Sequence, residues 1–241
     1  RTDGRFAWGR YLGKRLLRIA PAYLFVLAIV VAGLIPLYRV STDDLSFRIG
    51  YHMLFLQDYL RADIVVAFWS LGVEEKFYLL APFLMLAVLR IERPARQAGF
   101  LLGLVGLVLL VRSWSAWTMS GIDTYADFFP AFRSPFHMVA DGLLLGVLCR
   151  TLWRHRECFG WLTQALGAHL LFWAGAVLIG WLLLDGALMA EIRWFDKTLQ
   201  GTAIPAAFAA MMRGFCAAAA RGLCSAQRAC SSSRGFPTAS T

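Results

Sequence analysis

The chain has 241 residues, of which 59% are hydrophobic and only 16% are charged. Soluble domains are about 45–50% apolar and about 25% charged, so this composition excludes an ordinary soluble protein. The formal net charge of +9 is carried by short basic clusters beside hydrophobic runs, which indicates membrane orientation and argues against a nucleic-acid partner. The five cysteines have no CxxC or Cys/His spacing, so neither a disulfide framework nor a metal site is predicted.

Long apolar runs dominate the chain. A helix needs about 20 mostly apolar residues to cross a bilayer, because lipid offers no partner for bare backbone groups. Five runs approach this length, and a shorter sixth run reaches across if it extends upstream into residues 128–132. We therefore predict an all-α, polytopic transmembrane bundle of about six membrane helices. The six runs are Pro21–Tyr38, Trp69–Leu89, Ala98–Trp117, Phe136–Leu148, Phe159–Leu184 and Leu199–Met212.

A seventh stretch, Phe47–Leu60, carries polar residues among aromatic ones and is predicted to be an interfacial or re-entrant segment. If it does not span, the basic loops at 1–18, 90–96 and 150–156 all lie on one side of the membrane. The acidic loops then lie on the other side. The positive-inside rule places the N-terminus and the basic loops in the cytoplasm, as in a multi-pass protein of the inner cell membrane.

A basic cluster precedes the first run. Lys14 and Arg18 are four residues apart, so they share a helix face, and Arg15 lies beside them. Pro21 then opens the apolar run, at a position where a missing N–H costs little. One interpretation is a plain topology signal. The other is a phosphate clamp, because clustered guanidinium groups suit a diphosphate such as that of coenzyme A.

The second run contains charged residues, in the stretch Trp-Ser-Leu-Gly-Val-Glu-Glu-Lys-Phe-Tyr at 69–78. A charge within a bilayer costs on the order of 2.5–3.5 kcal/mol, so it marks a functional site by default. Ser70, Glu74 and Phe77 share one helical face, so Glu74 is expected to face a polar interior. Glu75 turns away and is expected to pair with Lys76 or another neighbour. The alternative is an interfacial helix end with snorkelling charges.

Further polar residues lie in the later runs. His137 and Asp141 are four residues apart, and a histidine with a carboxylate one turn away can act as an oriented base. The alternative is a satisfied polar contact. Arg133 lies just upstream, at the presumed outer end of its run. Arg112 lies within an apolar stretch and is expected to pair with an acid that the sequence does not identify.

Taken together, these stretches resemble the acyltransferase-3 family, the membrane enzymes that include O-antigen and exopolysaccharide O-acetylases. The most specific part of the resemblance is the Trp-Ser-Leu-x-x-Glu-x-x-Phe-Tyr pattern downstream of the basic run and its proline. The stretches that carry the resemblance are Arg15–Tyr23, Phe55–Tyr59, Trp69–Tyr78 and His137–Gly146.

The resemblance implies transfer of an acyl group, usually acetyl, from acyl-CoA to a hydroxyl of a carbohydrate or lipid-linked envelope molecule, with no bound cofactor. In such an enzyme Arg15 and Arg18 would contact the acyl donor, and Glu74 would belong to the polar site. The candidate catalytic residues are Glu74, His137 and Asp141. The candidate residues for binding substrate or acyl donor are Arg15, Arg18, Trp69, Ser70, Tyr78 and Arg133.

The chain departs from the family pattern in three places. The family's first helices, which carry a histidine thought to be catalytic, would precede Arg1. Val139 occupies a position where the family often has an arginine, and the family's last helices should follow Met212. We therefore predict a fragment, with a partial acyltransferase domain at 1–212 and an atypical basic tail, disordered or frameshifted, at 213–241.

Two other functions fit the composition. One is a transporter or lipid-binding membrane protein in which Glu74 and Arg112 line a proton or substrate path. An internal repeat with broken helices would mark a transporter, and the sequence contains no such repeat. The other is an inactive, truncated product.

Overall fold

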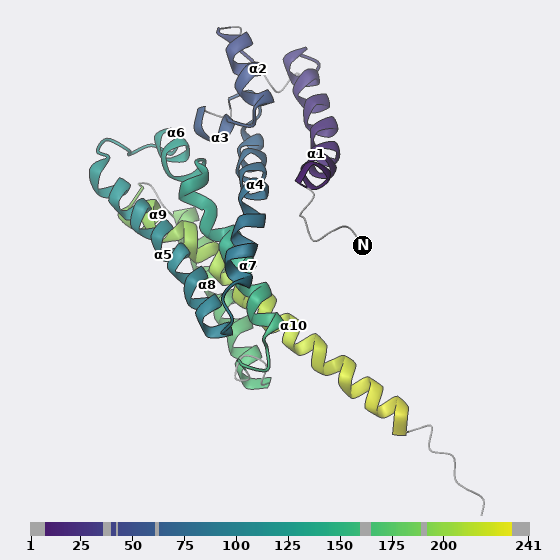
Figure 1. Ribbon diagram of the computed structural model, residues 1–241. Coiled ribbons are helices and arrows are strands. Elements are labelled where there is room, and N and C mark those ends of the chain that lie inside the picture. The colour runs from purple at the N-terminus through teal and green to yellow at the C-terminus, as the bar shows by residue number, and fades with distance from the viewer. Residues whose placement is uncertain are drawn as a thin grey trace, which may run out of the picture. The chain divides into compact units, whose positions relative to one another are not determined.

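The protein is all-helical in a computed structural model, which describes residues 8–35, 40–41, 43–60, 63–159, 165–188 and 192–232. None of these residues forms a strand. In chain order the elements are α1 (Trp8–Val31), α2 (Leu45–Met53), α3 (Gln57–Leu60), η1 (Val66–Phe68), α4 (Trp69–Leu89), α5 (Pro94–Thr118), α6 (Tyr125–Phe128), η2 (Phe129–Arg133), α7 (Phe136–Arg154), α8 (Ala165–Leu188), α9 (Trp194–Thr198) and α10 (Gln200–Ser232), as Figure 1 shows.

Among the described residues, three helices are long and apolar enough to cross a membrane. They lie at Pro94–Thr118, Phe136–Arg154 and Leu166–Asp185, and they coincide with three of the six predicted runs. The α7 helix is longer than its predicted run because it continues through the basic residues that follow. By their length and composition, these helices indicate a membrane protein.

The α1 and α4 helices differ from these three because they carry clustered charges. The α1 helix includes the basic cluster, and only the 13 residues from Ile19 to Val31 form an uninterrupted uncharged stretch. At 1.5 Å per residue that stretch is about 20 Å long, shorter than the roughly 30 Å hydrocarbon core. The α4 helix carries Glu74, Glu75 and Lys76 in its N-terminal half. Whether either helix spans stays a prediction.

The segment between α1 and α4 does not form one long helix. The α2 helix has nine residues and α3 has four, so at 1.5 Å per residue they are about 14 and 6 Å long. Between them Phe55 has φ +55°, a left-handed conformation that is strained for a bulky side chain. Whether Phe47–Leu60 is interfacial or re-entrant stays a prediction.

The chain divides into two compact units, of which the first comprises residues 1–90 and 117–140. Its core forms where one face of α1 meets the segment before α4. The buried side chains of this core are Tyr23, Leu27, Val30, Ile64, Val65 and Phe68. Three of these side chains, Tyr23, Leu27 and Val30, lie on α1 and form its buried face.

The second unit comprises residues 91–116 and 141–241. Its α8 and α10 helices lie side by side in close contact. A Cβ atom added to Gly175 would lie 2.5 Å from the carbonyl oxygen of Ala207, and one added to Gly214 would lie 2.5 Å from that of Ala168. Small residues thus allow the two backbones to approach, as in membrane helix pairs. The α10 backbone stays helical to Ser232, into the segment predicted as an atypical tail.

Candidate functional site

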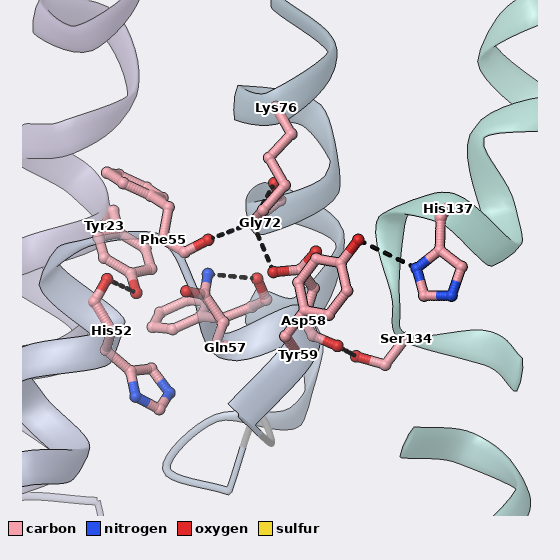
Figure 2. Close-up of polar contacts among 11 residues, drawn as sticks. Tyr23, His52, Phe55, Gln57, Asp58, Tyr59, Gly72, Lys76, Ser134 and His137 are labelled. Atoms are coloured by element: carbon pink, nitrogen blue, oxygen red, sulfur yellow. Dashed lines mark hydrogen bonds and ion pairs between the residues drawn. The ribbon is translucent and has the colours of Figure 1, made fainter. Parts of the chain in front are cut away.

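A buried ion pair lies at the centre of the first unit. Lys76, on α4, donates from Nζ to Oδ1 of Asp58, on α3, at 2.6 Å. The same ammonium group donates to the carbonyl oxygen of Phe55 at 2.7 Å and to that of Gly72 at 3.3 Å. Figure 2 shows these partners converging on the lysine. The aspartate is 1% exposed, so its charge depends on this lysine for compensation.

Local backbone features make this pair possible. The left-handed turn at Phe55 reverses the chain between α2 and α3 and leaves the Phe55 carbonyl facing Lys76. Gly72 allows the approach from α4, because a Cβ atom there would lie 3.0 Å from Asp58 Oδ1 and 3.1 Å from the Phe55 oxygen. The Asp58 Oδ2 atom is buried and has no hydrogen-bond partner among the described residues.

Three buried hydrogen bonds hold α2 and α3 in place. The Gln57 Nε2 atom donates to the carbonyl oxygen of Phe68 at 2.8 Å. The Ser134 hydroxyl donates to the backbone oxygen of Asp58 at 2.8 Å. The Tyr23 hydroxyl donates to the backbone oxygen of His52 at 2.8 Å. Since buried polar groups normally find partners, the first two bonds fix the four-residue helix α3 to η1 and to the segment before α7, and the third joins α1 to α2.

The exposed edge of the site is formed by Tyr59 and His137. The Tyr59 hydroxyl lies 3.0 Å from His137 Nδ1, and the two rings are stacked with centroids 5.6 Å apart and an interplanar angle of 14°. The Lys76 ammonium lies 5.5 Å from the Tyr59 ring centroid, within cation–π range. Partial burial raises the pKa of Tyr59, so the hydroxyl is neutral at pH 7 and can donate or accept.

Arg15 and the α4 carboxylates form a second polar group in this unit. The Arg15 guanidinium lies 4.5 Å from the Tyr78 ring centroid, which is a close cation–π contact. Glu75 interacts electrostatically with Arg15 and with Glu74. Its Oε1 atom is buried and has no hydrogen-bond partner among the described residues. Glu74 itself is half-buried.

Of the two partners expected for Glu75, Lys76 or another neighbour, the structure favours the second, because Glu75 interacts electrostatically with Arg15. Lys76 instead reaches back to Asp58, a residue 18 positions earlier. Adjacent residues on a helix point about 100° apart, so they seldom meet. The Phe55 turn brings Asp58 within hydrogen-bond distance of the lysine.

The remaining predicted binding residues of the first unit have other contacts. The Ser70 hydroxyl donates to the carbonyl oxygen of Ala67 at 3.1 Å. The Trp69 ring packs edge-on against Phe129, with centroids 5.7 Å apart. Arg133 is half-buried and ends the π-helical turn η2. The Arg18 side chain is exposed on α1.

A separate ion pair lies in the second unit. Arg112, on α5, is 1% exposed and donates from one guanidinium nitrogen to Asp141 Oδ2 at 2.9 Å. Its other terminal nitrogen donates to the carbonyl oxygen of Thr198 at 2.8 Å and to the Thr202 hydroxyl at 3.0 Å. The Thr202 hydroxyl also donates to Asp141 Oδ2. Asp141 is thus the acid that sequence analysis could not identify.

His137 and Asp141 therefore have different partners, although they are four residues apart on α7. His137 bonds to Tyr59, and Asp141 bonds to Arg112, Thr202 and its own neighbouring backbone N–H at Gly142. The geometry gives Tyr59, and not Asp141, the position from which to orient the imidazole.

Sequence analysis assigns no site role to Asp58, Tyr59 or Lys76. The signal for the pair was present, because a lysine within an apolar helix needs a counter-charge and Asp58 is an acid among aromatic residues. Choosing Asp58 among the available acids requires the α2–α3 turn. The role of Tyr59 has no signal beyond its position next to Asp58.

A third polar network surrounds α2. The Tyr51 hydroxyl donates to Asp63 Oδ1 at 2.6 Å, and Arg48 pairs with the other oxygen of Asp63 at 2.7 Å. His52 Nδ1 donates to the carbonyl oxygen of Arg48 at 2.8 Å, since a carbonyl only accepts. Burial, followed by the Asp63 hydrogen bond, raises the pKa of Tyr51 to about 12. Burial lowers the pKa of His52.

Within the described part of the chain, no group of three or more His, Cys, Asp or Glu side chains could hold a metal ion. In comparisons with known proteins, no protein-family model, no curated protein and no solved structure matches the chain. The function is therefore argued from the residues and the geometry of the first unit.

Proposed function

We propose that the chain belongs to an integral membrane O-acyltransferase that moves an acyl group, most simply acetyl, from acyl-CoA to a hydroxyl of a carbohydrate or lipid-linked envelope molecule. The observation that carries the proposal is the direct bonding between the stretches of the family resemblance. Asp58 bonds to Lys76 at 2.6 Å, and Tyr59 bonds to His137 at 3.0 Å. Three stretches, apart in sequence, contribute to one polar group.

In this proposal His137 is the general base. Tyr59 accepts from Nδ1–H, which leaves the exposed Nε2 atom as a proton acceptor. Nε2 takes the proton of the acceptor hydroxyl as the hydroxyl oxygen attacks the thioester carbonyl. The carbon–sulfur bond then breaks, and the protonated histidine returns its proton to the departing thiolate of coenzyme A. The products are the acyl ester and coenzyme A.

The ion pair beneath the histidine positions Tyr59. The Lys76 ammonium lies against the Tyr59 ring, and Asp58 holds that ammonium in place. Asp58 is buried and bonds to Lys76 through Oδ1 and to Ser134 through its backbone oxygen, so it acts as a positioning residue. The Asp141 carboxylate forms an ion pair with Arg112 in the second unit, and this pair stabilises that unit.

The donor side of the proposed site uses the α1 arginines. Arg15 is held over Tyr78 near the α4 carboxylates, and Arg18 lies one turn further along α1 with an exposed side chain. Guanidinium groups at this position suit the diphosphate of coenzyme A. Glu74, half-buried on α4 and interacting electrostatically with Glu75, is proposed to bind the reacting hydroxyl.

The proposed topology extends the three apolar helices to six. In it α1, α4 and the first part of α10 also cross the membrane, and the α2–α3 segment is re-entrant. The basic loops face the cytoplasm of an inner membrane, where acyl-CoA is available. Charges in the N-terminal half of α4 are tolerable in such a span because Lys76 is paired.

The proposal is tested by incubating the purified full chain with acetyl-CoA and following the release of free coenzyme A thiol. We expect acyl release above that of buffer, and a loss of at least 100-fold on His137→Asn, from the usual contribution of a general base. His169→Asn, which removes an exposed histidine of α8, is the matched control and should be fully active. Absence of thiol release from the folded chain would overturn the proposal for this chain.

A further inference from the structure

The α1 helix has a continuous exposed stripe of side chains. The proposed acyl transfer uses only one of them, Arg18. Arg10, Lys14 and Arg18 are spaced four residues apart and all three are exposed. At 100° per residue their side chains span an arc of about 80° on the helix. Pro21 and Phe25 continue the same arc, and Phe25 is 66% exposed.

The opposite face of α1 is occupied by the protein. Tyr23, Leu27 and Val30 are buried in the core of the first unit. Arg15, the one other basic side chain in this part of the helix, lies about 60° outside the stripe and rests on the Tyr78 ring. The stripe is therefore a surface of cations that continues into apolar side chains, with no acidic residue on it.

We propose that this stripe binds an anionic phospholipid, with its phosphate on Arg10, Lys14 and Arg18 and its acyl chains along Pro21 and Phe25. The dimensions suit such a molecule. Arg10 and Arg18 are about 12 Å apart along the axis, and Phe25 lies about 10 Å beyond Arg18, where the hydrocarbon begins. Long basic side chains converge on a headgroup by extending along the helix.

The cationic part and the apolar part of the stripe both favour an anionic phospholipid. Basic residues next to a membrane helix attract anionic headgroups electrostatically. A nucleic acid or an acidic peptide would match the cations but would leave Phe25 and Pro21 in contact with water. A phospholipid satisfies both parts of the stripe. The inference does not depend on catalysis, because lipid binding is measured without turnover.

Coenzyme A carries a diphosphate of similar charge, so the experiment must separate the two sources. The full chain is purified in a neutral detergent and titrated with phosphatidylglycerol that carries a fluorescent acyl chain. Phosphatidylcholine with the same label is the zwitterionic control. We expect phosphatidylglycerol to bind more tightly, and to remain bound in excess coenzyme A because Arg10 and Lys14 still hold it.

Substitutions at two neighbouring residues distinguish a specific lipid-binding site from a simple effect of the net charge. Lys14→Gln and Arg15→Gln each remove one positive charge from neighbouring positions, but only Lys14 belongs to the stripe. We expect Lys14→Gln to weaken phosphatidylglycerol binding about fivefold, the usual effect of one basic residue at an anionic surface. Arg15→Gln should weaken it by less than about twofold. The combined variant Arg10→Gln/Lys14→Gln/Arg18→Gln should bind both lipids equally.

Two outcomes would overturn the inference. Equal losses for Lys14→Gln and Arg15→Gln would mean that only total charge matters. Complete displacement of phosphatidylglycerol by coenzyme A would assign the stripe to the acyl donor. Because Lys14 is exposed, its substitution should leave the fold intact, and the helical circular dichroism of both single variants verifies this.

Discussion

Lys76 and Asp58 form an ion pair of 2.6 Å although 18 residues separate them in the chain. The aspartate side chain is fully enclosed while the lysine is 21% exposed. Water therefore reaches the pair from the lysine side only. Among the described residues, the Lys76 ammonium is the one cation bonded to this carboxylate, so we expect the pair to govern the stability of the α3–α4 contact.

Replacing Lys76 alone should lower the free energy of unfolding much more than replacing both Lys76 and Asp58. Lys76→Met leaves a buried, uncompensated carboxylate and should lower the free energy of unfolding by about 3 kcal/mol. Asp58→Asn combined with Lys76→Met removes both charges and should recover more than half of that loss. Denaturant titration in detergent measures both, with Lys14→Met, at an exposed lysine, as the control. A double variant as unstable as the single one would contradict this account.

Even the smallest side chain at position 72 should destabilise the protein. A methyl group there meets Asp58 Oδ1 at 3.0 Å and the Phe55 oxygen at 3.1 Å, so Gly72→Ala must displace the atoms that bind Lys76. We expect a loss of about 1–2 kcal/mol, since overpacking outweighs the gain in helix propensity. Thermal unfolding measures the change.

The matched control for that substitution is Gly103→Ala on α5. Nothing lies within 4 Å of a Cβ atom at Gly103, so the change should be neutral or stabilising by up to about 1 kcal/mol. Equal effects at the two glycines would show that the Asp58 contact has no special importance.

The helical class and three apolar spans follow from sequence because they depend on local properties. Runs such as 98–117 need only length and apolarity, which are visible without a fold. The partner of Arg112 is an example of what the sequence alone does not predict. An arginine in an apolar run must have a partner, yet its pairing with Asp141 depends on which helices are neighbours, and apolar faces of similar character do not specify that order.

The candidate site was predictable only in part, for the same reason. The stretches at 55–59 and 69–78 both carry the family resemblance, but the sequence predicts no contact between them, and the Lys76–Asp58 bond is seen only in the structure. The partner of His137 was not predicted. A carboxylate four residues away is the obvious neighbour on a helix, but Asp141 bonds to Arg112. Tyr59 reaches the imidazole through a turn that contains a left-handed phenylalanine, and no propensity predicts that geometry.

The buried Arg112 pair should be necessary for the second unit. Arg112→Met leaves Asp141 without its guanidinium in a site that is 1% exposed, and should cost about 3–5 kcal/mol. Gly201→Ala tests the same contact from the other side, because a Cβ atom there would lie 2.7 Å from an Arg112 terminal nitrogen. Gly180→Ala, with open space around the new methyl group, is its control. Unchanged stability in Gly201→Ala would contradict the close packing described here.

The stability of the first unit should decrease on mild acidification through His52. Burial lowers the pKa of His52 below its ordinary value of 6.5, and its Nδ1 atom already donates to the Arg48 carbonyl. Below about pH 6.5 the unfolded chain takes up a proton that the folded chain resists. The unfolded state then binds more protons, so the free energy of unfolding decreases as the pH decreases. Above pH 6.5 both states are neutral and the contribution is fully retained.

The measurement is the thermal unfolding midpoint between pH 7.5 and pH 5.5, for the unmodified chain and for His52→Gln. The glutamine keeps a donor for the Arg48 oxygen and cannot titrate, so its midpoint should decrease less over this range. His169→Gln removes an exposed histidine of α8 and should leave the pH dependence unchanged. If His52→Gln kept the full pH dependence, the acid sensitivity would have to come from other groups, and the enclosed imidazole would not be its cause.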